Sequence, residues 1–266
     1  METIHVLGYF GALAVGLVLG LMGGGGSIMA FPIFAYLFQI SPMMTATYSL
    51  FVVGTSASVG ALKSFKKGLI EFRIAFVFAI PVFAAVYITR RFLIHHIPEQ
   101  LISIRGFELT RDMGIMLLFA VLMIIASISM IWEKKEPIHD ETIVRFNYPL
   151  MIGGGFLIGI LTGVVGIGGG FLIIPVLVLI VKLPMKKAVA TSLSIIALKS
   201  FIGFSGDFTN LEINWPFLTI FTLISISGMF LGIYLSSFVK GDNLKKSFGW
   251  FVLIMAIVIF CKEAFT

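Results

Sequence analysis

Two runs of glycine in this chain could bind an anion through backbone N–H groups. The runs are Gly23, Gly24, Gly25 and Gly26, followed by Ser27, and then Gly166, Gly168, Gly169 and Gly170. Each run lies inside a long apolar stretch, where one glycine destabilises a helix by about 1 kcal/mol relative to alanine. The runs therefore predict breaks in two helices. A break leaves N–H donors and the positive end of the helix dipole at the start of the next helix, which favours an anion.

Tight packing between helices is the alternative interpretation of these glycines. The spacing Gly-x-x-x-Gly, which is typical of close helix pairs, occurs at 16–20, 159–163 and 228–232. For these pairs we expect packing. Packing needs alternate small residues and not four in a row, so we interpret the two runs as a site. Neither run is followed by Gly-Lys-Ser/Thr or fits a soluble βαβ unit, which excludes a nucleotide-binding loop.

Hydroxyl side chains recur after each glycine run. Ser49 follows the first run, and Thr191 and Ser192 follow the second. Near the start of a spanning helix these hydroxyls could bind an oxyanion. They could equally form hydrogen bonds between helices, each worth well under about 2 kcal/mol. The residues alone leave both interpretations open.

Lys199 is a charged residue within the apolar segment 194–204. A lysine inside a spanning helix is costly and by default marks a substrate or ion pathway. Its ammonium could contact an anion, or its long side chain could extend toward the membrane surface. We count it among the candidate substrate-binding residues.

The chain offers little for catalysis or metal binding. Its histidines lie at ends or in loops without metal-site spacing, and a single cysteine, Cys261, excludes a thiolate cluster. No nucleophile and base occur together. We therefore expect no catalytic residue, no metal, no cofactor and no enzymatic activity. No basic stretch interleaved with aromatic residues suggests a nucleic acid as partner.

The composition indicates a helical protein that lies in the lipid bilayer. Of the 266 residues, 59% are hydrophobic and only 12% are charged, whereas soluble domains carry about 25% charged residues. The mean hydropathy is +1.08. We therefore expect an all-α integral membrane protein.

The apolar segments form two halves related by a constant offset of 143 residues. Gly16 recurs as Gly159, and the structural motif residue Pro32 recurs as Pro175. Each half has five apolar segments, of which the second is only about 13 residues long, against the ~20 needed to cross a bilayer. Each half is thus predicted as a glycine-broken helical hairpin plus three spanning helices, about 8–10 membrane segments in all. The boundaries are a first membrane repeat at 1–131, a cytoplasmic linker at 132–146 and a second, inverted repeat at 147–266.

Inversion follows from the odd number of crossings in each half, and the charges offer a test. Lysine and arginine collect in cytoplasmic loops. The loop 40–44 has none, whereas its equivalent 182–187 has three lysines. This bias predicts a cytoplasmic linker and both termini outside. The loop 90–112 disagrees, because its four arginines lie on the predicted outer side.

The repeated Gly-x-Gly-Gly-Gly…Pro element, with the hydroxyl segments and Lys-Gly-Leu-Ile-Glu-Phe at 67–72, resembles the sulfite exporter TauE/SafE family over essentially the whole chain. That family is also known as the 4-toluene sulfonate uptake permeases. Its motif positions fall here on Gly23, Gly25, Gly26, Pro32, Ser49, Gly166, Gly168, Gly169, Gly170, Pro175, Thr191 and Ser192. Three positions depart from the pattern. Tyr48 stands where the second half has Thr191, Asn210 or a neighbour stands where Gly68 would repeat, and Lys199 stands where an uncharged polar residue is expected.

The resemblance implies a multi-pass protein of a prokaryotic cytoplasmic membrane whose substrate is sulfite, a sulfonate or a related anion. We expect a secondary transporter that works by alternating access, with the two hairpin tips meeting near the midplane. Coupling to protons or to the membrane potential is expected. The alternatives are an anion channel and a non-transporting membrane scaffold for sulfur metabolism. The Gly-x-x-x-Gly faces permit a homodimer.

Overall fold

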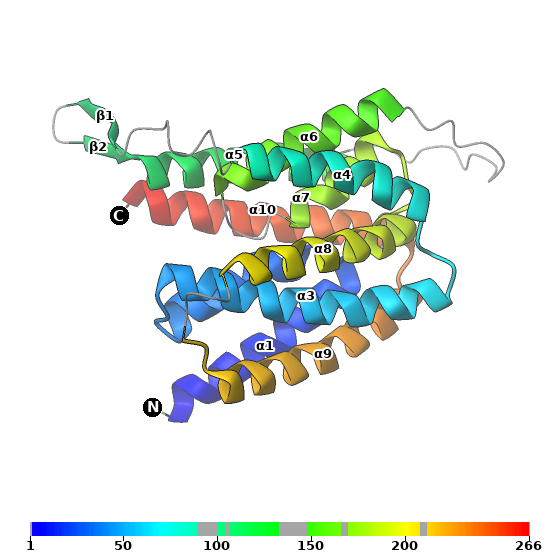
Figure 1. Cartoon of the computed structure of the whole chain (residues 1–266), viewed down its shortest axis with the longest axis horizontal. Helices are drawn as coiled ribbons and strands as arrows, with labels where there is room; N and C mark the ends of the chain where they lie inside the picture. Colours follow the sequence, from blue (N-terminus) through cyan, green and yellow to red (C-terminus); the bar gives the residue numbers. More distant parts are fainter. Residues whose placement is uncertain are drawn as a thin grey trace.

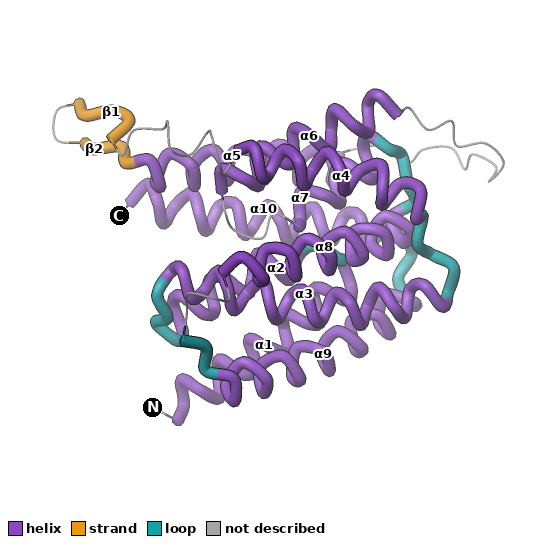
Figure 2. Tube along the Cα trace, viewed as in Figure 1, coloured by secondary structure: helices purple, strands orange, loops and turns teal. Residues whose placement is uncertain are grey.

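The computed structural model describes residues 2–89, 100–104, 107–132, 148–165, 170–207 and 212–265. The helices are α1 (Glu2–Met22), α2 (Gly25–Pro32), α3 (Pro42–Lys66), α4 (Phe72–Ile88), α5 (Arg111–Trp132), α6 (Tyr148–Val165), α7 (Gly170–Pro175), α8 (Met185–Asp207), α9 (Trp215–Phe238) and α10 (Gly241–Phe265). Helices make up nearly all of the described chain (Figure 2). The expected all-α membrane class is confirmed.

A small β-hairpin is a feature of the described chain that the sequence did not predict. Strand β1 (Gln100–Ile104) pairs antiparallel with β2 (Phe107–Thr110) directly before α5. It lies within the arginine-rich loop whose charge disagreed with the predicted sidedness.

Four helices in the described chain are long and apolar enough to cross a membrane. They cover Met44–Lys66, Met185–Ser205, Trp215–Phe238 and Gly241–Cys261. Shorter apolar helices, among them Leu7–Met22 and Phe72–Ile88, accompany them. The helical segments after the glycine runs are short, as expected. Each consists of an α-helix that ends at a proline and a π-helical turn that follows it. These turns are η1 (Ile33–Leu37), after Pro32, and η4 (Val176–Ile180), after Pro175.

The boundaries of the elements repeat at the offset of 143 residues. Helices α3 and α8 begin at Pro42 and Met185, and helices α4 and α9 begin at Phe72 and Trp215. Even a rare backbone conformation recurs, because Gln39 and Lys182 have positive φ angles of 51° and 60°. The two halves therefore share one local fold.

Equivalent helices of the two halves run in opposite directions. In Figure 1, α3 runs from left to right and α8 from right to left, whereas α4 runs from right to left and α9 from left to right. Both termini lie at the left end of the molecule (Figure 1). These directions agree with the inverted repeat that the loop charges predict.

The fourth helix of each half packs against the other half. Helix α1 packs chiefly along α9, and the equivalent pair is α6 with α4. Helices α3 and α8 contact each other, as do α5 and α10. Below, "first bundle" denotes α1, α2, α3 and α9, and "second bundle" denotes α6, α7, α8 and α4. Figure 1 shows α1, α3 and α9 below, α4 and α6 above, and α8 between them.

Close approach between α1 and α9 explains the isolated glycines. A Cβ atom at Gly16 would overlap the backbone of Ser225, and a Cβ at Gly228 would overlap the carbonyl of Leu13. Gly20 and Gly232 face each other's backbone in the same way. The packing interpretation of these Gly-x-x-x-Gly pairs is confirmed.

Candidate anion site at two helix breaks

The first glycine run interrupts the helical structure between α1 and α2, as the sequence predicts. Gly23 has a φ of +76°, a conformation in the left-handed region that only glycine adopts at little cost. The N–H of Gly23 donates to the carbonyl of Leu19 at 2.7 Å, and that of Gly24 to Met22 at 3.0 Å. Helix α2 then begins at Gly25 without a side-chain cap. Because an α-helix leaves its first N–H groups without intrahelical partners, the start of α2 can donate to a ligand.

The second glycine run separates α6 from α7. Helix α6 ends at Val165 and α7 begins at Gly170. Gly166, Gly168 and Gly169 lie outside the described residues, so the break is described only at its two edges.

The first break meets the start of α7, the helix that follows the second glycine run. A Cβ at Gly24 would lie 2.5 Å from Phe171 Cα and 2.6 Å from the carbonyl oxygen of Gly170. On the other side of this contact, a Cβ at Gly170 would lie 3.6 Å from Ser27 Oγ. Glycine is thus required where the hairpin of one half crosses the hairpin of the other.

Helix α8 covers this crossing with one face. A Cβ at Gly23 would lie 2.7 Å from Ser192 Oγ, and a Cβ at Gly170 would lie 2.8 Å from Ile196 Cγ1. Lys199 follows on the same face, because residues four and seven positions after Ser192 share its side of a helix. Lys199 is partly buried. The structure therefore places Ser192, Ile196 and Lys199 along one stripe that begins at the breaks.

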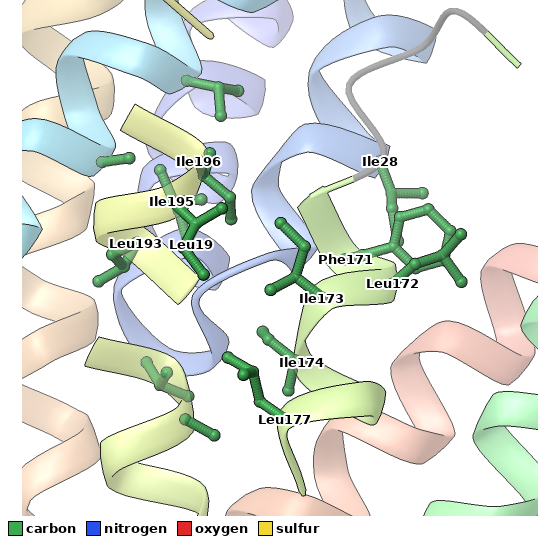
Figure 3. Close-up of a cluster of buried hydrophobic side chains, with 14 of the residues drawn as sticks. Leu19, Ile28, Phe171, Leu172, Ile173, Ile174, Leu177, Leu193, Ile195 and Ile196 are labelled. Carbon is green, nitrogen blue, oxygen red and sulfur yellow. The ribbon is translucent and has the colours of Figure 1, made fainter. Parts of the chain in front are cut away.

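Apolar side chains seal the surroundings of the crossing. Figure 3 shows Phe171 and Leu172 of α7 beside Ile28, whereas Ile173 and Ile174 lie on the opposite side of α7, toward Ile195 and Ile196 of α8. Residues 23–28 and all of α7 are buried. In this conformation the first break and the start of α7 are covered by protein, which is the condition for broken backbone at membrane depth.

The serine hydroxyls at the crossing donate to their own helices. Ser27 Oγ donates to the carbonyl of Gly24 at 2.8 Å, and Ser192 Oγ donates to that of Val189 at 2.9 Å. To donate to an anion, each hydroxyl would have to rotate about its Cα–Cβ bond. The backbone N–H groups at the start of α2 need no such change. Ser49, at the position equivalent to Ser192, is 5% exposed on α3.

Thr191 has a different partner from Ser192. Its Oγ1 accepts a hydrogen bond from the N–H of Glu71, directly before α4, at 3.2 Å. At the equivalent place in the other half, Tyr48 Oη accepts from the N–H of Asn214, directly before α9, at 2.8 Å. Tyr48 thus accepts with its phenol oxygen the bond that Thr191 accepts with its shorter hydroxyl. Two different residues at equivalent positions therefore do the same task.

An ion pair that sequence reasoning missed lies beside Thr191. Lys187 Nζ is 2.9 Å from Glu71 Oε1, with the two side chains 40% and 34% exposed. The residues are 116 positions apart, and no local pattern signals their contact.

A pocket elsewhere, of about 260 Å³, is lined by Tyr9, Phe10, Leu13 and Ile224 and includes none of the candidate site residues.

The chain is similar to a known protein family and to individual membrane proteins over nearly its whole length. The model of the family described as "Sulfite exporter TauE/SafE" matches residues 9–259. A "Probable membrane transporter protein" of Xylella fastidiosa is 29% identical over 257 residues, which cover 92% of this chain and 90% of that protein. The "Probable membrane transporter protein YunE" of Bacillus subtilis is 27% identical over 280 residues, covering 94% and 93%.

An archaeal relative matches over a shorter stretch. A membrane transporter protein of Methanocaldococcus jannaschii, likewise named as probable, is 37% identical over 115 residues, which cover 41% of this chain and 43% of that protein. No solved structure matches the chain. The match to the family model over nearly the whole length, together with the helical membrane fold, shows that this chain is a multi-pass membrane transporter and belongs to the sulfite exporter TauE/SafE family.

Proposed function

We propose that this protein is a secondary transporter that moves a small sulfur-containing anion, such as sulfite or a sulfonate, across the cytoplasmic membrane by alternating access. The observation that carries the proposal is the contact of Gly24 with Gly170, where the glycine breaks of two oppositely directed halves cross. Paired breaks at a repeat interface are typical of substrate sites in transporters, since their helix ends can bind ions.

The anion would be held mainly by backbone N–H groups. The donors in this proposal are those of Gly25, Gly26 and Ser27 and, from the other half, those of Gly166, Gly168, Gly169 and Gly170, whereas Gly23 and Gly24 shape the break and donate to Leu19 and Met22. Ser49 and Ser192 would add hydroxyls, that of Ser192 after its O–H turns away from the carbonyl of Val189. We assign Thr191 a different task, since its hydroxyl accepts from the N–H of Glu71 and so holds the start of α4.

Lys199 would supply the positive charge of the site. It lies on the α8 face that begins at the breaks, where its ammonium would attract a bound anion and offset part of the cost of removing that anion from water. This attraction favours an anionic over a neutral substrate.

Burial of the breaks supports a carrier rather than an open channel. Residues 23–28 and all of α7 are buried, so an anion at the crossing would be enclosed. Access from either side then requires movement of the surrounding helices, which is what alternating access describes.

Flux into proteoliposomes tests the proposal. We would measure uptake of labelled sulfite, thiosulfate and sulfoacetate by the purified protein at set pH gradients and voltages. Saturable uptake of one anion, accelerated by the same anion inside, is the expected result, and its dependence on pH or voltage identifies the coupling. Flux without saturation or countertransport would support a channel, and no flux of any of the three by folded protein would contradict the substrate class.

A further inference from the structure

One hydrogen bond occurs twice in this molecule at the offset that relates its halves. The N–H of Asn214, at the start of α9, donates to Tyr48 Oη of α3 at 2.8 Å. The N–H of Glu71, at the start of α4, donates to Thr191 Oγ1 of α8 at 3.2 Å. In both cases a hydroxyl from one half holds the first residue before a helix that belongs to the other half.

Each of these bonds lies inside one bundle. The bond to Tyr48 joins α3 to α9 in the first bundle, where Ser56 Oγ of α3 also donates to Ser225 Oγ of α9 at 3.1 Å. The bond to Thr191 joins α8 to α4 in the second bundle. Polar ties therefore connect helices from different sequence halves within a bundle.

Each bond has a second support of a different kind. The Tyr48 ring lies edge-on to Phe34, with centroids 5.8 Å apart, and 6.1 Å from Phe217 of α9. On the opposite side, the Glu71–Lys187 ion pair again joins the start of α4 to α8. The aromatic contacts and the ion pair strengthen the same two junctions.

The contact between the two bundles includes leucine side chains that pack on glycines, in contrast to the hydrogen bonds within each bundle. Leu50 of α3 packs against Gly203 of α8, where a Cβ would lie 3.1 Å from Leu50 Cδ1. The equivalent contact places Leu193 of α8 against Gly60 of α3, at 3.2 Å. Both contacts are apolar, with a leucine of one helix seated on a glycine of the other, and packed helices can move against each other by small shear movements.

We propose that Tyr48 and Thr191 are positioning residues that clamp α9 to α3 and α4 to α8. The bodies that move against each other during transport are then the first and second bundles, each containing one helix from the other half, and not the two sequence halves. This inference rests on the proposed function for its transport readout, whereas the clamps themselves can be measured without transport.

Disulfide cross-links distinguish the two sets of moving bodies. In a Cys261→Ser background, Ser56→Cys/Ser225→Cys would link the two sequence halves inside one bundle, since the native hydroxyls are 3.1 Å apart. The matched pair Leu50→Cys/Gly203→Cys would link the two bundles, because a Cβ at Gly203 lies 3.9 Å from Leu50 Cγ, within reach of a disulfide. Both pairs are assayed reduced and oxidised, so that each reduced protein is its own control for folding, and loss of free thiols on oxidation verifies that each disulfide has formed.

The expected result is that oxidation leaves uptake unchanged in the Ser56/Ser225 pair and abolishes it in the Leu50/Gly203 pair, with recovery on reduction. Loss of uptake on oxidising the Ser56/Ser225 pair would overturn the proposal, because that result requires movement between α3 and α9. Unchanged uptake with the Leu50/Gly203 pair oxidised would also overturn it.

Hydrogen exchange tests the clamps whether or not the tested anions are transported. In Tyr48→Phe the amide of Asn214 loses its acceptor, and we expect its exchange in detergent to rise by about threefold to tenfold while the centre of α9 keeps its protection. Thr191→Val should do the same at Glu71, and Thr191→Ser should restore protection. The exposed Tyr234→Phe on α9 is the control. Unchanged exchange at both amides would refute the clamps, whereas absent flux in the unmodified protein would refute only the proposed function.

Discussion

At the scale of single residues, the glycines of this chain have two different tasks. Gly16, Gly20, Gly228 and Gly232 let two helix backbones touch, whereas Gly23 adopts a φ of +76° and ends a helix. The distinction was predictable, because spaced glycines fit packing and runs of glycine do not. The partner of Thr191 was not predictable, since Glu71 is 120 positions away.

Replacement of Lys199 by methionine tests its proposed contact with the anion. The side chain stays long and apolar but loses its charge, so we expect the KM for the transported anion to rise at least about tenfold, as for loss of a charge-assisted contact. Initial uptake rates across a concentration series measure this. An unchanged KM would remove Lys199 from the site.

At the scale of the elements, the breaks and the short hairpin arms could be read from the sequence, but their details could not. Glycine runs predict where α1 and α6 end because glycine is a poor helix former. The π-helical turns after Pro32 and Pro175 leave no pattern that distinguishes them from an ordinary helix. The hairpin at 100–110 was overlooked because it lies in a loop between two spanning segments.

The close contact between α1 and α9 predicts that one methyl group added on α9 lowers the stability of the protein. In Gly228→Ala the new Cβ would overlap the carbonyl of Leu13, and overpacking of this kind typically costs about 1–3 kcal/mol. We expect a lower melting temperature in detergent. Gly153→Ala, whose Cβ would meet nothing within 4 Å, is the control, and equal melting temperatures for the two variants would contradict the close contact.

At the scale of the whole molecule, the repeat predicted two halves and their opposite directions, but not the exchange of α4 and α9. Hydrophobic patterns define which segments are helices, and they carry little information about which helices become neighbours. The pairs α1–α9 and α4–α6 became visible only in three dimensions. In the proposed moving bodies, α4 and α9 therefore each travel with a bundle built mainly from the other half.

Sidedness can be tested with two introduced cysteines. Ser41 and Lys67 are exposed and flank α3 at its two ends. In a Cys261→Ser background, we expect Lys67→Cys to react with a membrane-impermeant maleimide only from the cytoplasm, and Ser41→Cys only from outside, because basic loops stay cytoplasmic. Reaction of both from the same side would show that α3 does not span the membrane.

Equilibrium binding of the transported anion to purified protein tests most directly whether the crossed breaks are the site. The measurement compares the unmodified protein with Gly23→Ala, which strains a left-handed residue and places a Cβ 2.7 Å from Ser192 Oγ, and with Gly153→Ala, which contacts nothing. We predict saturable binding that Gly153→Ala keeps and Gly23→Ala loses, with both variants folded. Binding by Gly23→Ala as tight as that of the unmodified protein would contradict the account and place the anion elsewhere.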